Sequence, residues 1–146
     1  MTRKLPHRAE AVWPWLTDPQ RLIRWSPVVP DAALTSTGPR QIREQPGDDP
    51  SDGEVLSVEA PRELVHRWGA DVLRWRLTDT DTGCELTLEH RMAERDPAAM
   101  NAAGWHVCLD VLEPALDGAE VHRRVGPDAS QGGWEALRDE YAVALG

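Results

Sequence analysis

The sequence predicts an α+β fold in which a curved antiparallel sheet packs around one long C-terminal helix. Three observations predict it. Residues 53–94 alternate apolar and polar side chains in four strand-length runs, the period of half-buried strands. Residues 97–117 place apolar side chains at helical spacing. Two short helical patterns come before both. With 146 residues, we expect one domain, 1–146.

The N-terminal third predicts a short extended segment and then two short helices. The helix over 10–17 is followed by Thr17-Asp18-Pro19, where Asp18 can cap a second helix and Pro19 suits its first position. A strand is predicted near Arg40–Glu44. The acidic, turn-rich loop 45–53 reads as a flexible surface connection.

The four strand-length runs, 53–61, 62–69, 72–79 and 84–94, are joined by short turns and therefore predict an antiparallel meander. Alternation gives one apolar face, expected to point inward: Leu56, Val58, Leu64, His66, Trp68, Leu73, Trp75, Leu77, Cys84, Leu86, Leu88, His90 and Met92. The opposite face is charged and is expected to be solvated: Arg67, Arg74, Arg76, Glu85, Glu89 and Arg91.

Asp96-Pro97 is expected to cap the long helix, which ends near Gly118. Its apolar arc carries Trp105, Cys108, Leu109 and Leu112, and a second arc, expected to be solvated, carries His106, Asp110, Glu113 and Asp117. His106 and Cys108 stand about 200° apart around the helix, so they cannot form a thiolate–imidazole pair or a metal site within it. A last helix over 134–145 places Trp134, Leu137, Tyr141 and Leu145 on one face.

Composition excludes several classes of function. The net charge of −9 and the lack of a basic stripe argue against nucleic-acid binding. No apolar run reaches membrane-spanning length and no signal peptide is visible, so we expect a cytoplasmic protein with two reduced cysteines. Phosphate-loop, G-x-S-x-G, H-E-x-x-H and C-x-x-C motifs are missing, and we expect neither a cofactor nor a metal. The seven Trp fit a ligand pocket or a GC-rich genome equally well.

Two short helices, a meander and a long helix are the parts of the helix-grip (START-like) fold. The segments AVWPWLTDPQRLIRWSP, GEVLSVEAPRELVHRWG, TGCELTLEHRM and AAGWHVCLDVLEPALDG resemble bacterial proteins similar to the activator of heat-shock protein 90 ATPase. These belong to the SRPBCC (START, polyketide cyclase, Bet v allergen-like) superfamily. The closing GWEALRDEYAVALG also resembles the end of such chains. The resemblance implies an apolar cavity between sheet and long helix, with no shared catalytic residues.

Two departures from the family pattern are visible. Only about Thr2–Pro6 precede the first helix, so the first strand is shortened. Either the sheet edge is short, or the cavity is less enclosed, or a partner supplies the edge, as in a homodimer. The chain also lacks the separate N-terminal domain of the eukaryotic co-chaperone, which argues against a chaperone partner.

Three functions follow from these observations. The favoured one is non-enzymatic binding of a small apolar or aromatic ligand, with a cavity lined by His66, Trp68, Trp75, Leu86, Leu88, His90, Trp105, Cys108 and Leu112. The two histidines, with backbones about 10 Å apart, are either polar contacts for the ligand or satisfied core side chains. The second is a polyketide cyclase or aromatase-like enzyme using one of them as general acid/base, although no inward carboxylate or Tyr is evident beside either. The third is a chaperone-accessory or stress-response module whose acidic surface docks a basic partner.

Overall fold

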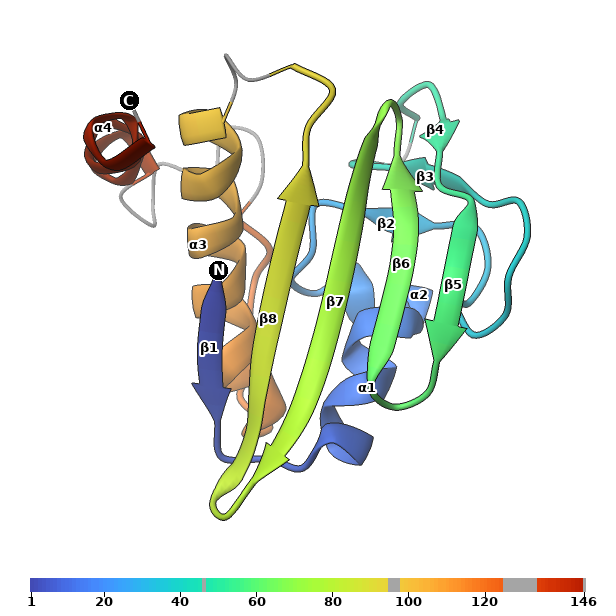
Figure 1. Ribbon diagram of the computed structural model, residues 1–146, viewed down its shortest axis with the longest axis vertical. Helices are drawn as coiled ribbons and strands as arrows, with labels where there is room; N and C mark the ends of the chain where they lie inside the picture. Colours follow the sequence, from blue (N-terminus) through green and yellow to red (C-terminus); the bar gives the residue numbers. More distant parts are fainter. Residues whose placement is uncertain (46, 95–97, 125–133, 146) are drawn as a thin grey trace.

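The computed structural model describes residues 1–45, 47–94, 98–124 and 134–145. A five-stranded antiparallel sheet dominates it, in the order β1-β8-β7-β6-β5. Figure 1 shows the sheet with the helices behind it. The strands are β1 (Thr2–Leu5), β5 (Val55–Glu59), β6 (Glu63–Trp68), β7 (Asp71–Thr80) and β8 (Gly83–Arg91). The predicted meander therefore corresponds to β5–β8, and the short extended segment to the edge strand β1.

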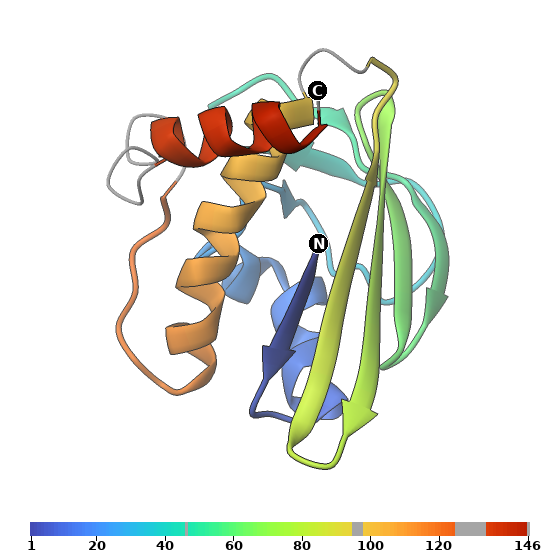
Figure 2. The same ribbon diagram turned by 60° about the vertical axis from the view of Figure 1, so that its left-hand side comes forward.

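The helices lie on one face of the sheet. They are α1 (Ala9–Thr17), α2 (Pro19–Leu22) and the long α3 (Ala98–Leu116), while α4 (Trp134–Leu145) crosses the N-terminal end of α3 (Figure 2). A small sheet is formed by β2 (Val29–Pro30), β3 (Gln41–Arg43) and β4 (Ser51–Asp52). Its last strand lies in the loop that we expected to be a flexible connection. No helix within the described ranges is long and apolar enough to cross a membrane.

Local sequence signals explain how the first elements meet. The Asp18 carboxylate accepts a hydrogen bond from the Gln20 N–H at 3.0 Å, and Pro19 occupies the first turn of α2, as predicted. Gly83 begins β8 where β1 ends beside it. A Cβ at this position would lie 2.0 Å from the Leu5 carbonyl oxygen, so only glycine lets the two strands approach. The predicted cap at Asp96-Pro97 lies outside the described residues.

One inward-facing assignment is wrong. Leu56 is 38% exposed, whereas Val55 beside it is buried. The pairing of β5 with β6 shifts between these positions, because Val55 pairs with His66 but Ser57 pairs with Val65. Two residues of β5 thus oppose one of β6, which is a β-bulge. The bulge breaks the alternation and turns Leu56 to the outer face.

Tryptophan rings fill the space between the sheet and α3. Trp75 packs edge-on against Trp25 and Trp105, with ring centroids 5.9 and 5.3 Å apart, and Trp105 meets Trp68 at 5.5 Å. Trp25, Trp75 and Trp105 are buried. Edge-to-face contacts of this kind add stability beyond the area that the rings bury. The space between the sheet and the middle of α3 is therefore closely packed.

Candidate functional site

His66 lies in the core and uses both ring nitrogens. Its Nε2 accepts a hydrogen bond from the Trp75 indole N–H at 3.1 Å, and its Nδ1 lies 3.1 Å from the Arg67 carbonyl oxygen. An indole can only donate, so Nε2 is the acceptor and Nδ1 carries the proton. Burial lowers the pKa of His66 to about 4, against the opposing effect of the bond to Arg67. His66 is thus a neutral core histidine with both ring nitrogens hydrogen-bonded within the protein, rather than a polar contact for a ligand.

His90 is fixed in the same way at the end of the tryptophan cluster. Its Nδ1 accepts from the Trp105 indole N–H at 3.1 Å, so Nε2 carries the proton and donates to Asp71 Oδ2 at 2.8 Å. Asp71 Oδ1 also accepts from the Ala93 N–H at 2.9 Å. Partial burial raises the pKa of Asp71, but these two hydrogen bonds and the nearby His90 outweigh it and lower the pKa.

Asp71 corrects the expectation that neither histidine has an inward carboxylate beside it. The sequence assigned Asp71 to a turn, but β7 begins there. Residues 71, 73 and 75 then share one face of the strand, which directs Asp71 inward beside His90. Extending the alternation of β7 by one step would have found it.

A pocket of about 290 Å³ opens at the N-terminal end of α3, where β8 and α4 approach it. It is lined by Met1, Leu88, His90, Met92, Ala98, Asn101, Ala102, Trp105 and Tyr141. β1 pairs with β8 only between Cys84 and Thr87, and Met1 pairs with Leu88. The pocket thus lies next to the stretch of β8 from His90 onward, beyond this pairing.

Only some of the residues predicted to line the cavity lie in this pocket. Leu88, His90 and Trp105 line the pocket of about 290 Å³. The other six predicted lining residues belong to the packed interior or lie against it, and line none of the three pockets described here: His66, Trp68, Trp75, Leu86, Cys108 and Leu112. Six other lining residues were not in the predicted set: Met1, Met92, Ala98, Asn101, Ala102 and Tyr141. Alternation had turned Met92 inward, but no periodicity reveals that Met1 and α4 pack at this end of α3.

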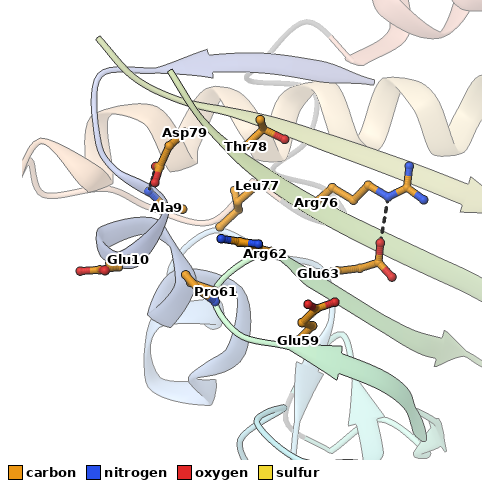
Figure 3. Close-up of a pocket in the computed structure, with 10 residues that line it drawn as sticks. All are labelled: Ala9, Glu10, Glu59, Pro61, Arg62, Glu63, Arg76, Leu77, Thr78 and Asp79. Atoms are coloured by element: carbon orange, nitrogen blue, oxygen red, sulfur yellow. Dashed lines mark hydrogen bonds and ion pairs between the residues drawn. The ribbon is translucent and has the colours of Figure 1, made fainter. Parts of the chain in front are cut away.

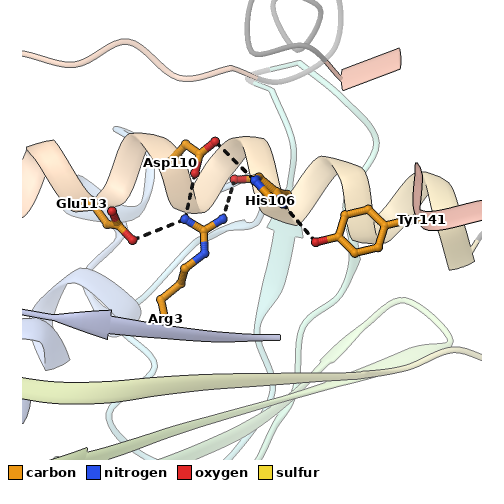
Figure 4. Close-up of polar contacts among 5 residues, drawn as sticks. All are labelled: Arg3, His106, Asp110, Glu113 and Tyr141. Carbon is orange, nitrogen blue, oxygen red and sulfur yellow. Dashed lines mark hydrogen bonds and ion pairs between the residues drawn. The ribbon is translucent and has the colours of Figure 1, made fainter. Parts of the chain in front are cut away.

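The polar arc of α3 is partly solvated, as expected, and partly paired with other elements: the side chains of Asp110, Glu113 and Asp117 are 39%, 43% and 62% exposed. The Arg3 guanidinium from β1 donates to Asp110 at 2.8 Å, to Glu113 at 3.3 Å and to the His106 carbonyl oxygen at 3.3 Å (Figure 4). His106 Nδ1 lies 3.0 Å from the hydroxyl of Tyr141 in α4. Helical geometry predicts the arcs of a helix but not their partners. Here β1 and α4 each contact part of the polar arc, and the rest faces solvent.

Two further pockets differ in character. The larger, of about 510 Å³, lies between the start of α1 and the β5–β6 turn (Figure 3). Charged side chains surround it, with Arg76 bonded to Glu63 at 2.9 Å and Asp79 accepting from the Ala9 N–H at 2.9 Å. A smaller one of about 150 Å³ lies beside β2 and β3. The larger is surrounded by charged groups, and the smaller, about half the volume of the pocket at α3, carries Asp31, Arg43 and Glu44 in its lining.

The cysteines and acidic residues form no evident reactive centre in the described part of the chain. Both cysteines are free and buried, and burial raises the pKa of the Cys108 thiol to about 12. A buried thiol of this kind is inert. No group of three or more His, Cys, Asp or Glu among the described residues is arranged to hold a metal ion.

The model of the family described as activator of Hsp90 ATPase homolog 1-like protein matches residues 6–117. The chain belongs to this family. The match ends at the C-terminus of α3, so α4 and its Tyr141 lie outside it. A search of curated proteins finds no match.

Solved structures share the fold of this family member. CalU16 from Micromonospora echinospora superposes with a TM-score of 0.73 at 22% identity, covering 97% of this chain and 83% of that one. A conserved protein of unknown function from Enterococcus faecalis gives 0.77 at 15% identity, covering 99% and 82%. DynU16, from the dynemicin biosynthetic locus, gives 0.71 at 27% identity over 82% of this chain, which spans about half of DynU16 (47%). The predicted helix-grip fold is confirmed.

Proposed function

We propose that the chain binds a small, uncharged, largely apolar ligand in the pocket at the N-terminal end of α3. The lining of this pocket carries the proposal, because it contains aliphatic, thioether and aromatic groups and no Asp, Glu, Lys or Arg. Its volume of about 290 Å³ is close to the lower end of ligand sites, about 300 Å³. The ligand is therefore expected to be no larger than two or three fused rings.

His90 supports binding rather than catalysis at this site. A general acid or base must exchange a proton with the substrate. Both ring nitrogens of His90 are already bonded, Nδ1 to Trp105 and Nε2 to Asp71. His90 holds the Trp105 ring in the wall of the pocket, and we assign it that positioning role. The cyclase-like alternative needs a free histidine nitrogen, which neither His66 nor His90 offers.

Filling the pocket tests the proposal. The probe is 2-naphthol, measured by isothermal titration calorimetry, with the charged analogue 2-naphthoate as a second ligand. Ala102→Phe places a ring in the pocket, while the matched control Thr78→Phe places one in the charged depression of Figure 3. We expect the wild type and Thr78→Phe to bind 2-naphthol, and Ala102→Phe to lose binding while keeping its melting temperature.

Two results would contradict the proposal. One is binding of 2-naphthol to Ala102→Phe with wild-type affinity, which would place the site elsewhere. The other is an absence of binding by the wild type, or a preference for 2-naphthoate, because no Lys or Arg lines the pocket and the amine of Met1 is bonded to the Leu88 carbonyl oxygen.

A further inference from the structure

Most polar groups around the pocket are already paired within the protein. The Trp105 N–H donates to His90, His90 donates to Asp71, and the amine of Met1 donates to the Leu88 carbonyl oxygen. Among the side chains that line the pocket, those of Asn101 and Tyr141 can still form hydrogen bonds with a ligand.

Tyr141 is held as a hydrogen-bond acceptor. His106 Nε2 faces Asp110 Oδ2 at 3.7 Å, and a carboxylate attracts the ring proton to that nitrogen. Nδ1 is then unprotonated and accepts from the Tyr141 O–H at 3.0 Å. The phenolic proton is thereby used, and the lone pairs of the oxygen remain available. The Arg3 guanidinium holds Asp110 in place through an ion pair of 2.8 Å, as Figure 4 shows.

Asn101 adds a second acceptor. Its Nδ2 donates to the thioether sulfur of Met92 at 3.3 Å. Its amide oxygen has no partner among the described residues. The pocket therefore offers two acceptors, the Tyr141 hydroxyl oxygen and the Asn101 amide oxygen, beside the second Nδ2 hydrogen of Asn101 and the remaining N–H groups of Met1. A ligand that carries a hydroxyl group can donate to either acceptor.

We infer that the ligand is an uncharged aromatic compound with a hydrogen-bond-donating hydroxyl group, as in a phenol, and that Tyr141 accepts this hydrogen bond. The inference rests on the proposed function of the pocket. The rings of Trp105 and Tyr141 provide aromatic surface for such a ligand. Tyr141 lies in α4, beyond residues 6–117 that the family model matches, so the C-terminal helix supplies this acceptor.

A matched pair of ligands tests the inference by calorimetry. 2-Naphthol donates a hydrogen bond, and 2-methoxynaphthalene has the same rings without the donor. We expect the wild type to bind 2-naphthol about fivefold more tightly, the value of one ordinary hydrogen bond. In Tyr141→Phe the aromatic wall stays and this preference disappears, with little change in the affinity for 2-methoxynaphthalene.

His106→Leu tests the positioning role of the histidine. It releases the Tyr141 proton, which can then donate to the methoxy oxygen, so the affinity for 2-methoxynaphthalene should rise toward that for 2-naphthol. A purely structural role of His106 would leave the ratio of the two affinities unchanged. The exposed Val143 offers the control Val143→Ser, an α4 substitution away from the pocket lining that should keep the wild-type ratio.

The outcomes separate the inference from the proposed function. Equal binding of both ligands by the wild type, or a fivefold preference that survives in Tyr141→Phe, overturns the inference and leaves the pocket as a ligand site. Failure of the wild type to bind either ligand overturns both.

Discussion

Replacing His66 with alanine should destabilise the protein severely without touching the ligand pocket. His66 and Trp75 are 2% and 3% exposed, so the Trp75 N–H would lose its acceptor in the interior of the protein. A buried unsatisfied donor costs about 1–3 kcal/mol, and the cavity left by the ring adds about 2–3 kcal/mol. We expect a loss of roughly 4 kcal/mol in the free energy of unfolding, measured by urea denaturation with circular dichroism.

A double-mutant cycle isolates the hydrogen bond from the cavity. In His66→Leu with Trp75→Phe both polar groups are gone, so the pair should lose less stability than the two single variants together, by about 1 kcal/mol. The reasoning is refuted if His66→Ala lies within 1 kcal/mol of the wild type, or if the two substitutions prove additive.

Three further predictions concern pH, the arginine at the sheet edge and the thiols. Burial lowers the pKa of His66 from 6.5 to about 4, so between these pH values the unfolded state binds more protons than the folded state. The stability that neutral His66 contributes is therefore present above pH 6.5 and falls by about 3 kcal/mol at pH 4. His66→Leu should flatten this pH dependence in urea titrations at several pH values. Arg3→Met should cost about 1 kcal/mol, less in 1 M salt, since its carboxylate partners are partly exposed; an unchanged unfolding midpoint would deny Arg3 its role in joining β1 to α3. Cys84 and Cys108 should be inert to Ellman's reagent in the native protein and react in urea, because both are buried with raised pKa values; a fast-reacting thiol in the native state would contradict their placement.

Local pattern was sufficient for the helices, for the five-stranded sheet and for most of the faces, but it missed β2 and β4 of the small sheet. The alternation that directed Leu64, Trp75 and Leu86 inward is obeyed, because a strand has no other way to present one apolar face to a helix. It failed at Leu56, where a bulge adds one residue to β5. A bulge depends on the pairing of two strands, and the sequence of one strand does not encode it alone.

The site was less predictable, because its geometry is set by contacts between distant segments. Trp68, Trp75 and Trp105 were expected to line a cavity between sheet and helix. The N–H groups of Trp75 and Trp105 instead bond to histidines, and the three rings pack against one another. The open volume lies instead at the end of α3, where Met1, β8 and α4 meet. Arg3 and Asp110, which contact each other next to the His106–Tyr141 pair, are 107 positions apart in the sequence, so no local pattern could have joined them.

The most direct test of the central claim is to locate a bound ligand through the indole N–H signals of the tryptophans. Titrating 2-naphthol into ¹⁵N-labelled protein, with signals assigned by single Trp→Phe variants, should shift the Trp105 signal, because its ring lines the pocket and its N–H bonds to His90. The Trp15 signal should stay in place, since that ring packs against Arg21 and Arg24 away from the pocket. A shift of Trp15 with Trp105 unchanged would place the ligand elsewhere and contradict the account.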